Sequence, residues 1–314
     1  MKILISVPAA FTSEHLMHLT NMGHLLTILQ GETIPEEMKV EDFEVVVCNN
    51  LLRDYPIEQF KNLKLIQLTS VGTDRIPLKY ILKQGIKIET ARGVYSIPIA
   101  EWVVLKILEI YKNSRFFHHV QQLHKWEKKR NLGELAGKTV AIIGYGSIGI
   151  ETAKRLKAFD VRITAIDSRI PDPEEMKWVD NLQPPHQLET VISQCDVLIL
   201  TIPLTEQTKH LMNEDRLLMM KSNSILINVS RGAIIDEQAL ITVLQQKKFM
   251  GVALDVFEEE PLSANNPLWD LENTLVTPHN AFVSDKNQQR LFDLFIANLN
   301  SNTIKYEEIS ANIA

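Results

Sequence analysis

The chain has little of several features that would point to particular classes of protein. It holds two cysteines in 314 residues, Cys48 and Cys195, and neither has a Cys or His neighbour at metal-ligand spacing. A disulfide framework and a metal site are therefore not expected, and both thiols are predicted to be buried in a reducing compartment. No apolar run approaches the ~18 residues of a membrane span, and no repeat or low-complexity segment is visible.

An excess of positive charge is also lacking. The net charge is −6, from 33 Lys and Arg against 39 Asp and Glu, which argues against nucleic acid or an anionic membrane as partner. The one basic run, Lys125–Arg130 (KWEKKR), is interrupted by Glu127 and is interpreted as a solvated helix face. The apolar start, Met1–Phe11, is too short for a signal peptide and predicts a first strand. We therefore expect a cytoplasmic protein.

The length and the ordinary composition, 45% hydrophobic and 23% charged, allow two domains with cores of their own. Short apolar segments alternate with helical ones in the first 90 residues, which predicts a small α/β domain with a parallel sheet. The strands predicted there are Ile3–Val7, Leu25–Leu29, Val45–Cys48, Leu65–Leu68 and Ile86–Ile88, and helical segments are predicted at Ile57–Asn62 and Pro77–Lys83.

A second, larger α/β domain is predicted after Ser96–Tyr111, a helix that is apolar on almost every side. Its predicted strands are Val140–Ile143, Val161–Ile166, Val197–Thr201, Ile225–Val229, Val252–Leu254 and Thr274–Thr277. The last predicted helix, Ser284–Asn300, has one apolar stripe and is expected to pack back on the first domain. The predicted domains are thus residues 1–95 plus 284–314, and residues 96–283 inserted between them.

Residues 139–149 (TVAIIGYGSIG) carry the most specific motif. A buried strand leads into Gly144, Gly146 and Gly149 in G-x-G-x-x-G spacing, and a helical pattern follows. Gly144 permits a tight turn, Gly146 lets the backbone approach a pyrophosphate, and Gly149 lets the helix pack on the strand. The helix N-terminus offers N–H groups to the phosphates. This segment therefore predicts a dinucleotide site.

An acid follows at the distance that such a site requires. Asp167 ends the next predicted strand, 18 residues after the last glycine (167 − 149). Its carboxylate can accept hydrogen bonds from both ribose hydroxyls and would repel a 2′-phosphate, which predicts NAD rather than NADP. Arg169 is interpreted as an exposed loop charge.

Three more segments place reactive residues just after predicted strands, where open parallel sheets bind their ligands. Arg231 in ILINVSRGAIID can pair with a carboxylate, or it can be structural, capping carbonyls or pairing with Asp236. Asp236 is itself placed as the N-cap of a helix over residues 236–246. The segment GVALDVFEEEP holds three adjacent glutamates, which alone are typical of a solvated loop. His279 in TPHN would alone be an ordinary loop histidine.

Taken together, these residue types suit the reduction of a 2-oxo acid. The reaction needs a hydride donor, which a nicotinamide supplies. It also needs a clamp for the substrate carboxylate, for which Arg231 is the candidate, and a proton for the developing alkoxide, for which His279 is the candidate. A neighbouring carboxylate at Glu260 would favour the charged imidazolium. In the oxidation direction the same histidine acts as the base.

The chain resembles the family of D-isomer-specific 2-hydroxyacid dehydrogenases, which includes D-lactate, D-glycerate, hydroxypyruvate and phosphoglycerate dehydrogenases. The resemblance covers essentially the whole chain and rests on GKTVAIIGYGSIG, LTIPLTEQTKHLMN, LINVSRGAIIDEQAL, GVALDVFEEEPL and TPHNAF, in the family's order. It implies a Rossmann doubly wound parallel sheet inserted into a smaller flavodoxin-like α/β domain. It also implies an NAD-dependent oxidoreductase for small D-2-hydroxy and 2-oxo acids, and a homodimer formed through the nucleotide domain. The family's active-site Arg, Glu and His fall on Arg231, Glu260 and His279, so the resemblance selects Glu260 among the three glutamates.

The resemblance implies further contacts. Besides the three glycines and Asp167, it places cofactor contacts at Ser147, Ile148, Thr201, Pro203, Thr208, Val229 and Asp255. Asp255 would face the nicotinamide amide, unless it is only a strand-end cap. Ser70–Asp74 (SVGTD) resembles the substrate loop, where the backbone N–H groups of Val71 and Gly72 would meet the substrate carboxylate. Ser96 would lie near the nicotinamide, or serve as a helix N-cap.

Some residues depart from the family pattern, and other functions stay open. Arg92 stands where many members have asparagine, and Asn280–Phe282 replaces a glycine-rich continuation. Arg53 and Arg75 can in principle contact a substrate phosphate but are interpreted as exposed charges. The main alternative is an NAD(H)-sensing, corepressor-like binding protein on the same fold. Formate or phosphite oxidation is less favoured, because formate enzymes of the family carry glutamine at the position of Glu260.

Overall fold

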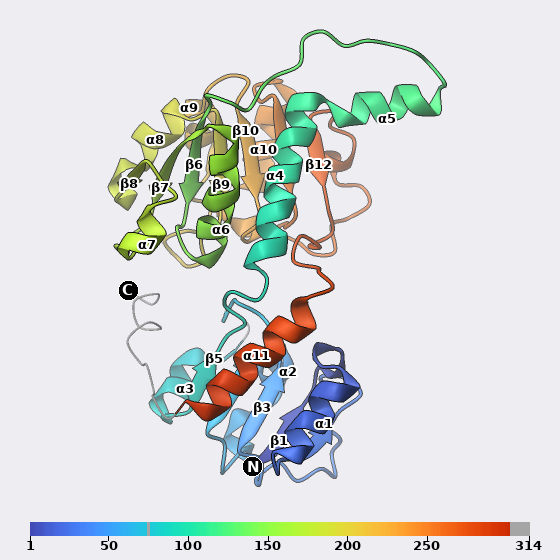
Figure 1. Cartoon of the computed structure of the whole chain (residues 1–314), viewed down its shortest axis with the longest axis vertical. Coiled ribbons are helices and arrows are strands. Elements are labelled where there is room, and N and C mark those ends of the chain that lie inside the picture. Colours follow the sequence, from blue (N-terminus) through green and yellow to red (C-terminus); the bar gives the residue numbers. More distant parts are fainter. Residues whose placement is uncertain (74–75, 302–314) are drawn as a thin grey trace. The chain divides into compact units, whose positions relative to one another are not determined.

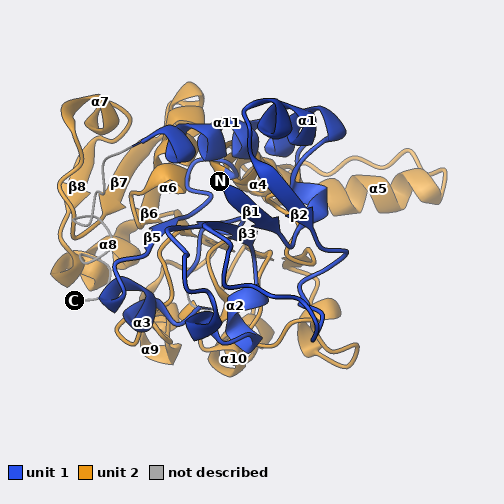
Figure 2. Ribbon diagram, turned by 90° about the horizontal axis from the view of Figure 1, so that it is seen from below, with its two compact units in different colours: residues 1–95, 284–314 blue, residues 96–283 orange. Residues whose placement is uncertain are grey.

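The structure, a computed structural model, describes residues 1–73 and 76–301. It divides into two compact units (Figures 1 and 2). Unit 1 comprises Met1–Tyr95 and the chain from Ser284 onward, and unit 2 comprises Ser96–Val283. Unit 2 is therefore inserted, in sequence, between the two parts of unit 1. The predictions for Asp74 and Arg75 lie outside the described residues.

Unit 1 contains a five-stranded parallel sheet in the order β2-β1-β3-β4-β5. This order is that of flavodoxin-like folds, as predicted. Strands β3 and β4 have the predicted bounds, because every residue in them is buried and all except Gln67 are apolar. The bounds are β1 Lys2–Ile5, β2 Leu25–Ile28, β3 Val45–Cys48, β4 Leu65–Leu68 and β5 Lys87–Glu89.

Helices cover both faces of this sheet. One face packs against α1 (Ser13–Asn21) and α11 (Asn287–Asn300), with Phe292 and Phe295 of α11 buried among the strands. The other face packs against α2 (Leu51–Asp54) and α3 (Leu78–Lys83). The segment predicted as helical from Ile57 forms one 3₁₀ turn, Ile57–Gln59, and a second such turn is Pro8–Ala10. The apolar stripe of the last helix thus packs on the unit 1 sheet.

Unit 2 contains a seven-stranded parallel sheet in the order β12-β11-β10-β9-β6-β7-β8. The strand order reverses between β6 and β9, which makes this the doubly wound Rossmann sheet that was predicted. The bounds are β6 Thr139–Ile143, β7 Arg162–Ile166, β8 Asn181–Gln183, β9 Val197–Leu200, β10 Ile225–Asn228, β11 Gly251–Leu254 and β12 Thr274–Val276. Strand β8 was not predicted, because it is short and mostly polar.

The helices of unit 2 lie on both faces of the sheet. Leu198 and Leu226 share one core with α8 (Leu188–Gln194), α9 (Glu214–Met219) and α10 (Glu237–Gln245). On the opposite face α4 (Ser96–Lys112) packs along α6 (Ser147–Leu156). Short segments complete the unit: α7 Pro173–Met176 and the 3₁₀ turns Lys157–Phe159, Pro185–Gln187, Gly232–Ile234 and Pro267–Trp269.

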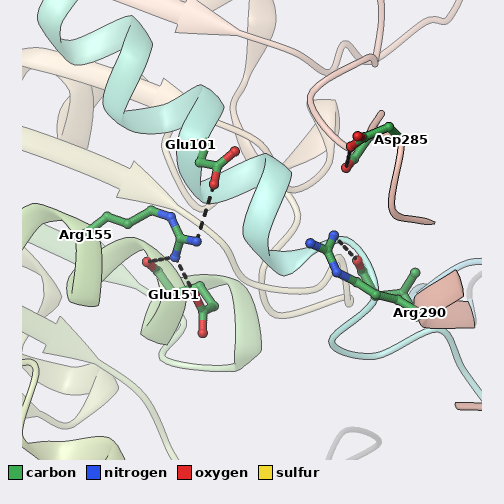
Figure 3. A network of polar contacts seen from close by, with 7 residues as sticks. Glu101, Glu151, Arg155, Asp285 and Arg290 are labelled. Atoms are coloured by element: carbon green, nitrogen blue, oxygen red, sulfur yellow. Dashed lines mark hydrogen bonds and ion pairs between the residues drawn. The ribbon is translucent and has the colours of Figure 1, made fainter. Parts of the chain in front are cut away.

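An arginine joins the two helices on that face. The guanidinium of Arg155 on α6 pairs with Glu151 one turn earlier and reaches Glu101 on α4 at 3.5 Å (Figure 3). The Arg155 side chain is 24% exposed, so the network is only partly screened by water. These contacts hold α6, the helix that follows the glycine motif, against the long apolar helix.

The segment after α4 corrects one sequence interpretation. Helix α5 (Ser114–Gln122) extends away from the sheet of unit 2 (Figure 1) and ends before the basic run. His124 has φ +53°, a left-handed conformation that terminates helices. The interpretation of Lys125–Arg130 as a helix face is therefore wrong, since these residues form a non-helical, largely exposed segment in which Trp126 is 95% exposed.

Both cysteines are buried and free, as predicted, and burial raises the pKa of Cys48 and that of Cys195, the latter to about 12. Across residues 1–73 and 76–301, no helix has both the length and the apolar content needed to cross a membrane.

Candidate active site

The glycine turn between β6 and α6 has the shape of a dinucleotide site. Gly144 has φ +92°, and a Cβ atom there would lie 2.8 Å from the Thr201 carbonyl oxygen. A Cβ on Gly149 would lie 2.4 Å from the Gly144 carbonyl oxygen. At Gly146, in contrast, no atom of the described residues lies within 4 Å of the Cβ position. The turn is therefore packed against protein at two glycines and open at the one that would face a pyrophosphate, so the residues fit the predicted cofactor.

The start of α6 and its neighbours support this turn. Gly146 is the N-cap, and Ser147 and Ile148 follow as partly buried residues of a first turn without acidic side chains. The Thr201 hydroxyl donates hydrogen bonds to the Gly144 carbonyl at 2.6 Å and the Ile143 carbonyl at 3.1 Å. Among the described residues no side chain caps the N-terminus of α6, so its first N–H groups and its dipole can face an anion.

Asp167 follows β7 and binds to the glycine turn itself. One carboxylate oxygen accepts the Tyr145 N–H at 2.6 Å, and the other accepts the Arg169 N–H at 2.8 Å. The Arg169 guanidinium in turn donates to the Tyr145 carbonyl at 2.9 Å and pairs with Glu175 at 3.3 Å. Arg169 is an exposed loop residue, as the sequence predicts, and these contacts in addition hold its guanidinium beside the glycine turn.

Other predicted cofactor contacts lie after β9 and β10. The Thr208 hydroxyl donates to the Pro203 carbonyl at 2.7 Å and accepts the Thr205 N–H at 2.7 Å, which closes the loop after β9. Val229 directly follows β10 and is 7% exposed. Thr208 and Val229 both lie in loops that follow the carboxyl ends of β9 and β10, on one side of the reversal point at which Rossmann sheets bind ligands.

Arg231 is positioned by a polar turn at the end of β10. The Asn228 side chain is buried, accepts the Ser230 hydroxyl at 2.6 Å, and donates to the Arg231 carbonyl at 2.9 Å. The Arg231 guanidinium donates to the Ser230 carbonyl at 2.8 Å. Asp236 accepts the Ala239 N–H at 3.0 Å and is the N-cap of α10, as predicted.

A close backbone contact joins this turn to the acidic loop. A Cβ atom on Gly232 would lie 1.8 Å from the Phe257 carbonyl carbon and 2.3 Å from the Glu258 nitrogen. Only glycine permits such an approach. Nothing in the local sequence signals this contact, because the two segments are 25 residues apart (257 − 232). The contact places Arg231 next to the loop that carries Glu260.

Glu260 and His279 form a hydrogen-bonded pair. One Glu260 oxygen lies 2.8 Å from His279 Nδ1, and the other accepts the Phe257 N–H at 3.1 Å. The Glu260 and His279 side chains are 32% and 35% exposed. Burial raises the pKa of Glu260, but the His279 hydrogen bond, the Phe257 N–H and the charges of His279 and Arg231 together hold it below its ordinary value. Glu260 is therefore hydrogen-bonded to His279 and lies within reach of the charge of Arg231.

Asp255 holds the loop that carries His279. Asp255 is 3% exposed, and its carboxylate accepts hydrogen bonds from the Thr277 hydroxyl at 2.5 Å, the Asn280 N–H at 2.8 Å and the Ala281 N–H at 2.9 Å. Burial raises the pKa of Asp255 despite these hydrogen bonds. His279 has φ +50° and donates its N–H to the Asp255 carbonyl at 2.8 Å. These contacts are those of a strand-end cap, and a nicotinamide contact by Asp255 stays a prediction.

The predicted substrate contacts lie in separate segments. Val71 is 40% exposed and Gly72 partly buried in the bend after β4, where the Ser70 hydroxyl donates to the Gly72 carbonyl at 3.1 Å. Ser96 is the first residue of α4 and is 3% exposed. Their roles toward a substrate stay predictions.

Comparison with known proteins agrees with this geometry. Residues 104–281 match the family "D-isomer specific 2-hydroxyacid dehydrogenase, NAD binding domain". The chain is 37% identical over 247 residues to a glyoxylate reductase of Thermofilum pendens, an alignment that covers 76% of this chain and 71% of that protein. The chain therefore belongs to the D-isomer specific 2-hydroxyacid dehydrogenase family and is an NAD-dependent oxidoreductase.

Two further comparisons extend over more of the chain. A D-3-phosphoglycerate dehydrogenase of Methanocaldococcus jannaschii is 32% identical over 290 residues, which is 92% of this chain but 55% of that protein. This chain thus spans about half the length of that relative. Among solved structures, D-lactate dehydrogenase of Aquifex aeolicus, in complex with NAD and lactic acid, has a TM-score of 0.79 at 25% identity and covers 95% of this chain and 94% of its own.

Proposed function

We propose that this protein interconverts small D-2-hydroxy acids and 2-oxo acids with NAD(H). The observation that carries the proposal is the Glu260–His279 pair, joined at 2.8 Å beside the loop of Arg231. Each of these residue types matches one need of the reaction, and the dinucleotide turn belongs to the same unit.

Arg231 is proposed as the carboxylate clamp. Its planar guanidinium can form two parallel hydrogen bonds with a substrate carboxylate, and its charge polarises the neighbouring carbonyl. The backbone turn supported by Asn228 and Ser230 fixes where the side chain begins. The guanidinium–carbonyl bond to Ser230 further limits the directions in which it can point.

His279 is proposed as the acid in reduction and the base in oxidation. Its Nδ1 is engaged by Glu260, so Nε2 is the ring nitrogen that would exchange a proton with the substrate oxygen. Glu260 stays ionised because its pKa is held low, and its negative charge stabilises the imidazolium. When bound, the nicotinamide supplies the hydride. The protein residues bind the carboxylate and move the proton.

The cofactor is proposed to lie along the residues that the glycine turn organises. Gly146 and the first N–H groups of α6 would take the pyrophosphate, and Asp167 would take the adenosine ribose. Two of the relatives are named glyoxylate reductase and hydroxypyruvate reductase, the latter from Thermotoga maritima at 35% identity. Small 2-oxo acids are therefore the proposed substrates.

We also propose a homodimer. On α5 and the segment after it, Phe117, Leu123 and Trp126 are 37%, 48% and 95% exposed. Large apolar side chains exposed on one projecting segment are typical of a protein interface.

The test is a panel of 2-oxo acids, assayed with NADH and with NADPH through the loss of nicotinamide absorbance. Glyoxylate, hydroxypyruvate, pyruvate and longer homologues form the panel. The proposal expects NADH-dependent turnover of at least one small acid and weaker use of NADPH. Tight NADH binding without turnover of any acid would instead favour the sensor alternative.

A further inference from the structure

We infer that Glu175 sets the preference for NAD over NADP by neutralising Arg169 at the adenosine-ribose end of the dinucleotide site. The inference rests on the cofactor site proposed above and concerns a residue outside the G-x-G-x-x-G motif. Arg169 stands two residues after Asp167, where a guanidinium would be suited to bind a 2′-phosphate.

In the structure this guanidinium is bound to other groups of the protein. Its Nη2 donates to the Tyr145 carbonyl at 2.9 Å, and its Nη1 pairs with a Glu175 oxygen at 3.3 Å. The Glu175 side chain is 24% exposed and that of Arg169 is 42% exposed. The more buried partner is the acid, so the pair is not simply two charges meeting in open solvent.

Several contacts fix Glu175 in this place. Tyr145, the residue between the first two glycines of the motif, is fully buried, and its hydroxyl donates to the Glu175 carbonyl at 2.7 Å. Asp172 accepts the Glu175 N–H at 2.8 Å, and the same Glu175 oxygen that meets Arg169 accepts the Asp172 N–H at 3.3 Å. The glycine turn and helix α7 therefore form one hydrogen-bonded unit around the guanidinium.

The charges of this unit disfavour a 2′-phosphate. Asp167, Arg169 and Glu175 sum to −1, and the extra phosphate of NADP adds a charge of about −1.5 to −2. Loss of the Glu175 charge would bring the sum to zero and leave Arg169 without its carboxylate partner. A guanidinium that gains a phosphate partner forms strong bidentate hydrogen bonds. Glu175 thus opposes NADP both through its charge and by occupying Arg169.

A merely structural role for Glu175 predicts something different. As part of the capping box of α7, the side chain needs only an acceptor oxygen, which glutamine also provides. Glu175→Gln therefore removes the charge and keeps the cap. Glu174→Gln is the matched control, because Glu174 lies on the same helix, pairs with Lys177 and is 84% exposed.

The experiment measures binding to the full chain by calorimetry, with adenosine 2′,5′-bisphosphate and 5′-AMP as probes and NADPH and NADH as the whole cofactors. We expect Glu175→Gln to raise the affinity for the bisphosphate, relative to that for AMP, about tenfold. This factor corresponds to the lower range of the free energy of a hydrogen bond to a charged group. The affinity for NADPH should likewise rise relative to the affinity for NADH. Glu174→Gln should leave both ratios unchanged, and adding Arg169→Gln to Glu175→Gln should abolish the gain.

Unchanged ratios in Glu175→Gln, or a gain that survives Arg169→Gln, would overturn the inference. Where Glu175→Gln does not fold, Arg169→Gln alone serves, because it changes the sum of the three charges from −1 to −2 and should therefore weaken binding of the bisphosphate relative to that of AMP. An unchanged ratio in that variant would also overturn it. Failure of the proposed cofactor site is a distinct result, because the wild-type protein would then bind neither NADH nor AMP.

Discussion

The contact between Gly232 and the acidic loop makes Gly232→Ala the sharpest structural test of the site. The added Cβ would lie 1.8 Å from the Phe257 carbonyl carbon, whereas ordinary contact begins at 3.4 Å. One of the two loops must therefore move by about 1.6 Å (3.4 − 1.8). The atoms that the Cβ would meet belong to the Phe257 backbone, which cannot rotate away as the end of a flexible side chain can. Forced expansion of packed segments costs about 1–3 kcal/mol of stability.

The cost to catalysis should exceed the cost to folding. Arg231 precedes the glycine and Glu260 follows the displaced segment, so the shift separates the proposed clamp from the proposed proton relay. A misplacement of about 1 Å can cost 10²-fold in rate, so kcat/KM should fall by at least about 100-fold. Steady-state kinetics and thermal unfolding of the same preparation measure both effects.

Gly31→Ala is the control, because within residues 1–73 and 76–301 no atom lies within 4 Å of its Cβ position, and it should behave as wild type. A Gly232→Ala variant that folds and keeps near wild-type kcat/KM would refute the reasoning, since the two loops would then not need this approach.

Four other substitutions test separate parts of the account. Arg231→Ala should lower kcat/KM for a 2-oxo acid by about 100-fold or more, because a charged hydrogen-bonding contact is lost, while NADH titration should show unchanged affinity. Asp167→Ser should weaken NADH binding and raise the NADPH-to-NADH ratio of kcat/KM, and an equal loss for both cofactors would discredit the ribose assignment. The pKa of Glu260 is lowered from its ordinary value of 4.5 in the folded protein. The ionised Glu260 side chain therefore stabilises the fold at pH values above 4.5, and this stabilisation is lost as the pH falls through the lowered pKa. Glu260→Gln should accordingly be less stable than wild type at neutral pH, with the difference in urea midpoint vanishing in acid, and a constant difference would count against this pairing. Trp126→Glu should convert the proposed dimer to monomer in light scattering, and an unchanged mass would exclude this surface.

Much of the fold was predictable because its signals are local. The buried strands β3 and β4 stood out as short apolar runs, and the glycine spacing located the turn before α6. Parallel strands with intervening helices then restricted the topology to a few arrangements. Strand β8 has no such signal, since it is an edge strand of three residues with a polar sequence.

The site was predictable only in part, because several of its contacts join segments that are distant in the sequence and leave no local signal. The resemblance, rather than spacing, selected Glu260, and the structure places that residue against His279. The approach of Gly232 to Phe257 and the pairing of Arg169 with Glu175 depend on segments that only the folded chain brings together. The prediction of a helix face for the basic run after α5 was wrong, because its charge pattern fits an exposed helix face and an exposed loop equally well.

The most direct measurement of the central claim compares wild type with His279→Gln in two assays on one preparation. NADH binding, followed by fluorescence titration, should be the same in both proteins, because the imidazole is assigned no part in holding the cofactor. NADH-dependent reduction of the preferred 2-oxo acid should fall by about 10²–10⁴-fold in the variant, the usual contribution of a general acid. Equal reduction rates in the two proteins would contradict a proton relay through His279 and Glu260.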